Sequence, residues 1–176
     1  MSRTYEQRFN RLLKSSYRYS AARYQIKKVQ PAFNRMIRAE AGAFVGAVWA
    51  VVGGVLYEMA SPLGYCVCVT CGELRPWEAS KQQSKGSLDA GHFLTSDRIA
   101  LEESNCHSQC VHCNRDQSGS GANYRLYMQN VYGQNVIDRL YRIKNSKTYE
   151  PPAREWLIAK RIECEDRIEL AVEKMA

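Results

Sequence analysis

Two pairs of cysteines, each with two residues between its members, constrain this chain more than any other feature. The first pair is Cys68 and Cys71, and the second is Cys110 and Cys113. A CxxC turn directs two thiolates to the same side, so two such turns can complete one tetrahedral zinc site. The 38 residues between the pairs exceed the spacing of a plain zinc ribbon. We therefore expect a structural Zn²⁺ that holds a small functional insert together.

Three further cysteines are expected to lie outside this zinc site. Cys66 and Cys106 are near the pairs in sequence, and Cys164 lies in a stretch with helical spacing. Cys66 could compete for the zinc, but the spacing of Cys68 and Cys71 suits a CxxC turn better. The CxxC pairing and the lack of a cleavable signal sequence favour reduced thiols and a cytoplasmic protein over a secreted disulfide scaffold.

Positive charge is concentrated at the N-terminus. Residues 1–40 hold ten Lys or Arg against only Glu6 and Glu40, so they account for the whole net charge of +7. Tyrosines interleave with the cations, a pattern typical of a basic helical arm that binds phosphate backbones. A solvated amphipathic helix whose charge serves only solubility is the alternative. The cations expected to bind a nucleic acid are Arg8, Arg11, Lys14, Arg18, Arg23, Lys27, Lys28 and, later in the chain, Arg115.

Residues 41–57 contain no charged side chain and are bounded by Glu40 and Glu58. A membrane span needs about 20 apolar residues, and this run is shorter, rich in Gly and Ala, and flanked by acids. We expect residues 41–64 to form a buried apolar helix with its end at Ser61–Gly64. Its place is either the core or a subunit interface, where small residues allow close approach.

Helical spacing dominates the last part of the chain. The apolar stripes expected on these helices are Tyr124, Tyr127, Met128 and Val131, then Val136, Ile137, Leu140 and Tyr141, then Leu157, Cys164, Ile168, Ala171 and Met175. Strands are expected only around the cysteine pairs and at Asp89–Phe93. The predicted class is α+β and mainly helical. Its parts are a basic helical arm (1–40), an apolar helix (41–64), a zinc-bound core (65–121) and C-terminal helices (122–176).

Polar residues in and just after the central insert form a set suited to phosphodiester hydrolysis. That reaction needs a base to take a proton from water and a divalent cation to stabilise developing charge. His92 is the best base, because an imidazole exchanges a proton near neutral pH. Asn114 can offer an amide oxygen, and Asp89 a carboxylate, to Mg²⁺ or Mn²⁺. Asn105 is expected to hold His92 in the correct tautomer.

His107 is a further candidate for the metal site, since it lies two residues after Asn105. A loop histidine bonded to backbone is the alternative. The whole insert also has an alternative, which is a zinc module that binds nucleic acid without catalysis. Such a module has no need of a base and two oxygen ligands beside its zinc.

Three segments carry a family resemblance: CVTCG (68–72), DAGHF (89–93) and ESNCHSQCVHCNRDQSG (103–119). They resemble the HNH, or ββα-metal, nucleases, and more closely the phage recombination nucleases of the NinG, or Rap, family. A looser likeness continues through Gly133–Asp138 into the last helix. The resemblance implies a zinc-stapled ββα-metal core and cleavage of branched recombination DNA, such as Holliday junctions. No small-molecule cofactor is expected.

The chain departs from the HNH pattern at two positions. Many HNH nucleases have Asp or His immediately before the base, where this chain has Gly91. Alternate residues of a strand face the same way, so Asp89 could reach the metal instead. Asn114 replaces the last His of the pattern, as in phage resolvases of the endonuclease VII type. Resolving a junction requires nicks on two strands, so we expect a two-fold homodimer.

Overall fold

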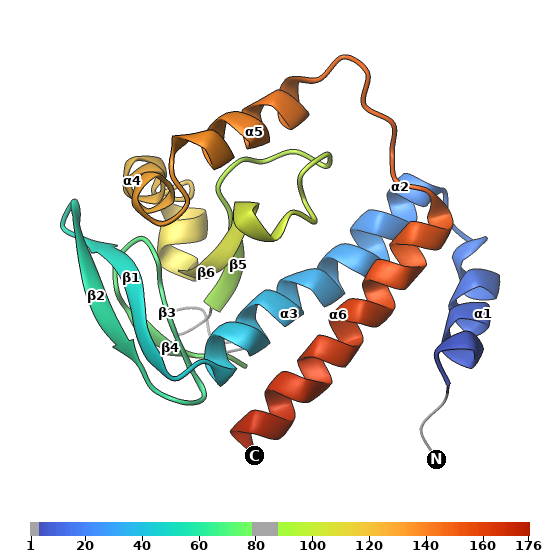
Figure 1. Cartoon of the computed structure of the whole chain (residues 1–176), viewed down its shortest axis with the longest axis horizontal. Helices are drawn as coiled ribbons and strands as arrows, with labels where there is room; N and C mark the ends of the chain where they lie inside the picture. Colours follow the sequence, from blue (N-terminus) through green and yellow to red (C-terminus); the bar gives the residue numbers. More distant parts are fainter. Residues whose placement is uncertain (1–3, 79–87) are drawn as a thin grey trace.

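The computed structural model describes residues 4–78 and 88–176, which form helices and three two-stranded antiparallel sheets (Figure 1). The mixed, mainly helical class expected from the sequence is confirmed. Long helices occupy one side of the view, and the small sheets lie against the end of α3 and beneath α4 and α5.

The basic N-terminal segment is helical, but it is not a detached arm. It comprises α1 (Tyr5–Ser16), α2 (Ala21–Tyr24), the π-helix η1 (Gln25–Val29) and α3 (Gln30–Ala43). Thr4 starts α1 through a capping box, since its hydroxyl accepts from the Gln7 backbone and Gln7 bonds back to the Thr4 backbone. Residues 1–3 of the expected arm lie outside the described residues.

The long C-terminal helix α6 (Arg154–Met175) packs along these N-terminal helices (Figure 1). One buried cluster joins Leu12, Tyr24 and Val29 to Leu157, Ile158 and Ile162. A second cluster places Phe33, Met36 and Ala39 of α3 against Cys164, Ile168 and Ala171 of α6. Cys164 is therefore a core residue, as its helical spacing indicated. Burying a Leu or Ile side chain contributes roughly 1.5–3 kcal/mol, so these clusters fix α3 firmly.

The expected apolar helix over residues 41–64 is wrong. α3 ends at Ala43, and the chain then forms a hairpin of β1 (Gly46–Val52) and β2 (Val55–Ser61). Pairing of Val52 with Val55 leaves Gly53-Gly54 as a two-residue turn, with φ of 59° and 83°. Positive φ at both positions is typical of the hairpin turn that needs glycine, and the Val-rich sequence favours strands.

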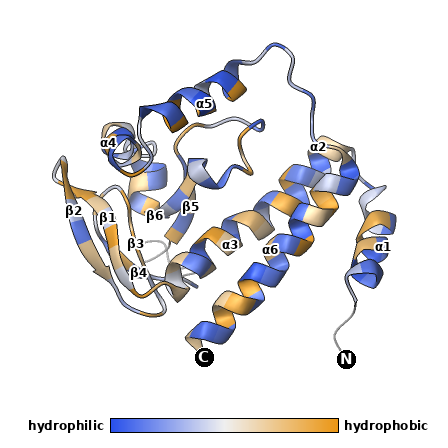
Figure 2. Ribbon diagram, in the orientation of Figure 1, coloured by the Kyte–Doolittle hydropathy of each residue, from blue (hydrophilic) through white to orange (hydrophobic). Residues whose placement is uncertain are grey.

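The hairpin carries most of the apolar colour on its side of the molecule (Figure 2). Within the described ranges, no helix is long and apolar enough to cross a membrane.

Two short sheets build the region around the cysteines. β3 (Tyr65–Val67) pairs with β4 (Leu74–Pro76), and the first CxxC turn connects them. β5 (Leu88–His92) pairs with β6 (Cys106–Cys110), and the second CxxC turn leads directly into the π-helix η3 (His112–Asp116). The 3-10 turn η2 (Glu103–Asn105) precedes β6. The order of elements is therefore strand, strand and helical turn.

The helices α4 (Gly121–Val131) and α5 (Gln134–Asn145) cover this region. The predicted stripes are largely confirmed, because the following members are buried in one cluster with Val51, Val69, Leu94 and Ile99: Tyr124, Tyr127, Met128, Ile137 and Leu140. Val131 and Tyr141 stay partly exposed. The Val51 amide donates to the Val69 carbonyl, and the Val69 amide donates to the Ser108 carbonyl, so the first CxxC turn links β1 to β6.

Candidate active site and metal centre

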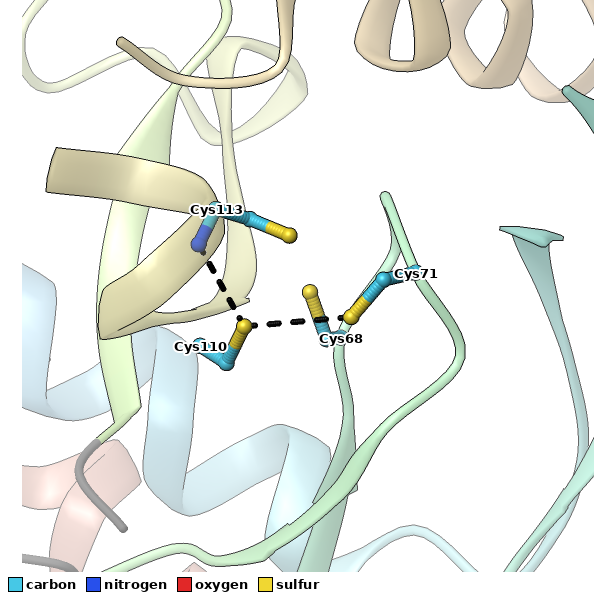
Figure 3. Close-up of side chains that lie close together, drawn as sticks. All are labelled: Cys68, Cys71, Cys110 and Cys113. Carbon is cyan, nitrogen blue, oxygen red and sulfur yellow. Dashed lines mark hydrogen bonds between the residues drawn. The ribbon is translucent and has the colours of Figure 1, made fainter. Parts of the chain in front are cut away.

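The four cysteines of the two CxxC turns converge in space (Figure 3). Their sulfur atoms all lie within 4.8 Å of one another, and the sulfurs of Cys71 and Cys110 are 3.8 Å apart. Two thiolates bound about 2.3 Å from one tetrahedral zinc are separated by roughly 3.8 Å. The donor set and the spacing therefore fit Zn²⁺.

Hydrogen bonds among these sulfurs favour the thiolate at Cys68, whereas the pKa values of Cys71 and Cys110 are raised. Hydrogen bonds from Cys110 and Cys71 lower the pKa of Cys68, and the Cys113 amide donates to the Cys110 sulfur at 3.4 Å. Burial instead raises the pKa of Cys66 and of Cys106. Both are neutral thiols at neutral pH, and neither belongs to the cluster.

His92 lies at the end of β5, and among the described residues one of its ring nitrogens has a hydrogen-bond partner and the other has none. Its Nε2 atom is 3.0 Å from the Ala100 carbonyl oxygen. A carbonyl only accepts hydrogen bonds, so Nε2 carries the proton and Nδ1 keeps its lone pair. Burial lowers the pKa of His92, although the Ala100 bond opposes this effect. A neutral imidazole with a free nitrogen can accept a proton from water.

Asn105 does not orient His92, contrary to the expectation from the sequence. Its amide accepts from the Leu94 amide at 2.9 Å and donates to the carbonyls of Leu94 and Ile99 at 3.0 and 3.1 Å. Asn105 thus closes the loop between β5 and β6, and this loop places the Ala100 carbonyl against His92. Its effect on the imidazole is indirect.

Asp89 holds the residues next to it. Its Oδ2 atom accepts from Asn114 Nδ2 at 2.9 Å and from Arg115 Nε at 2.8 Å, and its Oδ1 atom accepts from Arg115 Nη2 at 2.8 Å. Burial acts to raise the pKa of Asp89, but the bonds from Arg115 and Asn114 outweigh it and keep that pKa below its ordinary value. Asn114 uses its nitrogen for this bond, so its amide oxygen is the end that remains for a cation.

Gly91 has a structural reason to lack a side chain. A Cβ atom there would lie 1.9 Å from Oε1 of Gln109, which faces it from β6. The Gln109 amide donates to Thr70 and to the Gly119 carbonyl, both at 3.0 Å, and so joins the two CxxC regions. The space that a side chain at residue 91 would need is therefore filled by Gln109.

His107 is neither a metal-site group nor bonded to backbone through its ring. Its Nδ1 and Nε2 atoms lie 2.9 and 2.8 Å from the hydroxyls of Tyr124 and Tyr132. The Tyr124 hydroxyl donates to the Gly91 carbonyl, so it accepts from Nδ1, and Nε2 accepts from Tyr132. Both ring nitrogens are occupied, and burial lowers the pKa of His107 to about 3.

Two adjoining cavities of about 410 and 480 Å³ connect these groups, and His92 and Asn114 line both. Asp89 and Arg115 line the larger one. Three polar residues of α3 complete its wall, namely Gln30, Asn34 and Arg38. Sequence reasoning missed them, because only the packing of α3 on β5 and β6 brings them here. Their spacing of four residues was the available signal.

The expected DNA-binding cations have different surroundings. Arg8 is paired with Glu165 and Asp166 of α6, and Arg115 is paired with Asp89. The other six are exposed: Arg11, Lys14, Arg18, Arg23, Lys27 and Lys28. These six leave positive charge exposed along the N-terminal helices.

Comparisons with known proteins identify a family for this chain. The family model described as Bacteriophage Lambda NinG protein matches residues 65–169, more than half of the chain. The chain belongs to the NinG family. Over 76 residues it is 33% identical to protein ninG of Escherichia phage 933W and 32% identical to protein ninG of Escherichia phage lambda. Each match covers 42% of this chain and 33% of the relative, so the chain spans about a third of the length of these relatives. No solved structure matches the chain.

The region shared with the NinG family contains the cysteine cluster, β5, β6 and η3. It therefore includes His92 and Asn114. It begins at residue 65, so α3 and the β1–β2 hairpin lie outside it. The family match therefore gives no information about these two elements.

Proposed function

We propose that this NinG-family protein is a metal-dependent DNA endonuclease of the HNH type that acts on branched recombination DNA. One observation carries the proposal. The consecutive elements β5, β6 and η3 bring His92 and Asn114 to the same cavities, beside the four-cysteine cluster. This order of strand, strand and helical turn is the order that the ββα-metal resemblance implies.

His92 acts as the general base in this proposal. Its Nδ1 atom takes a proton from a water molecule as that water attacks the phosphorus. The Ala100 carbonyl holds the ring in the tautomer that leaves Nδ1 free, and burial keeps the imidazole neutral. These contacts support the choice of His92 over His107, whose nitrogens are both occupied.

Asn114 would hold the catalytic Mg²⁺ or Mn²⁺ through its amide oxygen. Such a cation stabilises negative charge on the phosphate and on the leaving oxygen. Asp89 orients Asn114 through the bond to its amide nitrogen. Direct binding of the cation by Asp89 would require Arg115 to release the carboxylate. Asn114→Ala is expected to lower the affinity for the cation. Excess metal should therefore partly restore the cleavage activity of this variant.

The decisive experiment is cleavage of matched linear and four-way-junction DNA in Mg²⁺ or Mn²⁺. The parent should cut the junction faster, and His92→Ala should lose a base worth about 10²–10⁴-fold in rate while it still binds DNA. His112→Ala is the matched control, because His112 has 65% of its side chain exposed and is paired only with Asp116 and Gln117 among the described residues. A parent that binds DNA but cuts none would favour the alternative, a non-catalytic zinc-containing nucleic-acid-binding protein.

We further propose a homodimer that works in the host cytoplasm. One site makes one nick, so a two-fold pair of sites would supply the opposing nick in matching geometry. The hairpin exposes large apolar side chains, including Trp49, Val55 and Tyr57, which suit burial between two copies. Light scattering should give a dimer mass on junction DNA, and Trp49→Glu should shift it to the monomer. A monomeric mass of the parent, free and bound, would exclude this assembly.

A further inference from the structure

The α3 helix turns a polar face toward the candidate active site. Gln30, Asn34 and Arg38 are spaced by four residues, so they lie on one side of the helix. All three line the cavity that also contains Asp89, His92, Asn114 and Arg115. The opposite side of the same helix carries the buried residues Phe33, Met36 and Ala39. The position of the polar face is therefore set by the core.

Two side-chain atoms on this polar face are buried without a partner. They are Asn34 Oδ1 and Arg38 Nε, and they are two of the five such atoms in residues 4–78 and 88–176. Most buried polar atoms in proteins are hydrogen-bonded, so each exception needs an explanation. Here two exceptions occur one helical turn apart and in the wall of one cavity. Both atoms are closed to solvent, so a ligand in the cavity would bond to the outer atoms of the same two side chains, which line the cavity wall.

The charges of the cavity specify an anionic ligand. Arg38 and Arg115 contribute two positive charges, and Asp89 contributes one negative charge. Asp89 is bound to Arg115 through two hydrogen bonds, which leaves Arg38 as the cation with unused capacity. Arg38 Nη1 donates to the Leu88 carbonyl at 3.1 Å, and this bond fixes the guanidinium at the start of β5. A guanidinium fixed in this way is a good phosphate donor.

We propose that Arg38 and Asn34 of α3 bind a phosphate of the DNA backbone next to the bond that is cut. Arg38 would donate through Nη2, since Nη1 is bonded to the Leu88 carbonyl, and Asn34 would donate through its amide nitrogen. The inference rests on the proposed nuclease function and adds a substrate-binding wall to it. That wall comes from a helix outside the region shared with the NinG family.

Binding of junction DNA should be measured with the full chain loaded with zinc and carrying His92→Ala, so that the DNA stays intact. Adding Arg38→Ala should weaken binding about tenfold, as expected for a charge-assisted hydrogen bond. The slope of log affinity against log salt should fall by about 0.9. Asn34→Asp keeps the side-chain shape but sets a carboxylate against the phosphate, so it should weaken binding at least as much.

Arg35→Ala is the matched control on the same helix. Arg35 is exposed, and its guanidinium lies over the Trp77 ring, 5.9 Å from the ring centroid. Its removal should leave affinity within about twofold and the slope unchanged. If Arg38→Ala and Asn34→Asp bind DNA as the control does, the proposal is wrong. This outcome does not depend on cleavage, so failure of the nuclease assay alone would leave the binding test valid.

A second measurement separates phosphate binding from a purely structural effect. Single neutral methylphosphonates are placed in turn across the centre of the junction. At the contacted position, the neutral group should weaken binding by the parent but have little effect on Arg38→Ala, because both changes remove the same interaction. The absence of any such position in the scan would overturn the assignment. Arg38→Lys keeps the positive charge of residue 38. It serves as the second variant if Arg38→Ala is unstable.

Discussion

His92 and His107 show at the residue scale how neighbours decide what an imidazole can do. They lie in the two paired strands of one sheet, His92 in β5 and His107 in β6. The sequence made both of them candidates for the active site. Within the part of the chain that the structure describes, His92 has one nitrogen bonded to a carbonyl and one without a partner, whereas His107 is bonded to two tyrosines from the α4 region. Those tyrosines are 17 and 25 residues away in sequence, so local spacing could not assign the two roles.

The buried His107 should make the protein sensitive to acid. Burial lowers its pKa to about 3 in the folded state from an ordinary value of 6.5. Between these values the unfolded chain binds one more proton at this residue, so stability is lost as the pH falls, by up to about 1.4 kcal/mol per pH unit. Urea unfolding of the zinc-bound protein between pH 7 and 5 should therefore show a smaller pH dependence in His107→Gln.

Thiolates of the cysteine cluster also bind protons on acidification, so the comparison must be between His107→Gln and the parent. The absolute stability of the variant is not the test, because the change also removes bonds to Tyr124 and Tyr132. An equal pH slope in the two proteins would contradict the role given to His107.

At the scale of elements, the sequence correctly predicted the helices and turns that are determined by local residue spacing. The stripes of α4, α5 and α6 follow helical spacing, and CxxC turns place their own cysteines. The β1–β2 hairpin was missed because an uncharged run has no polar residues to reveal its period. The informative signal was Gly53-Gly54 between two Val-rich segments. In the site, the α3 wall depends on packing between distant elements, which no local pattern contains.

The hairpin turn gives a direct test of this corrected element. Gly54 has φ of 83°, so Gly54→Ala should destabilise the protein by roughly 1–2 kcal/mol. Gly53→Asn is the control, because Asn-Gly is a preferred pair for such a turn. Chemical unfolding should separate the two variants. Equal losses in both would argue against a turn that requires positive φ.

A zinc ion held by the four cysteines would join the two CxxC elements and should therefore control folding of the region between them. Cys113→Ser removes one ligand, so elemental analysis should give less than one zinc per chain and the melting temperature should fall. Chelation of the parent should have the same effect. Cys164→Ala removes a buried cysteine outside the cluster, and it should keep the zinc. Full zinc content in Cys113→Ser would exclude it as a ligand.

At the scale of the whole molecule, the N-terminal helices combine two tasks. Their inner faces pack on α6 and on the cysteine region, while most of their cations stay exposed. Arg8 belongs to the packing, because it is paired with Glu165 and Asp166 of α6. The polar face of α3, which lines the cavity beside His92, belongs to one of these same helices. Cations on the surface of these helices are thus in a fixed relation to the candidate site.

This division predicts different effects for cations of the same segment. Combined replacement of Arg11, Lys14, Arg18 and Lys27 by Ala should weaken binding to linear and branched DNA alike, because exposed cations on a DNA-binding surface would contact phosphates without reading shape. The log–log salt slope should fall by about 0.9 for each phosphate interaction that the replacement removes. Arg8→Ala, the matched control, should lower the free energy of unfolding and change the slope little, because its charge is used within the fold. Titrations with both DNA forms at several salt concentrations would decide, and an unchanged slope in the fourfold variant would leave its charges a role in solubility alone.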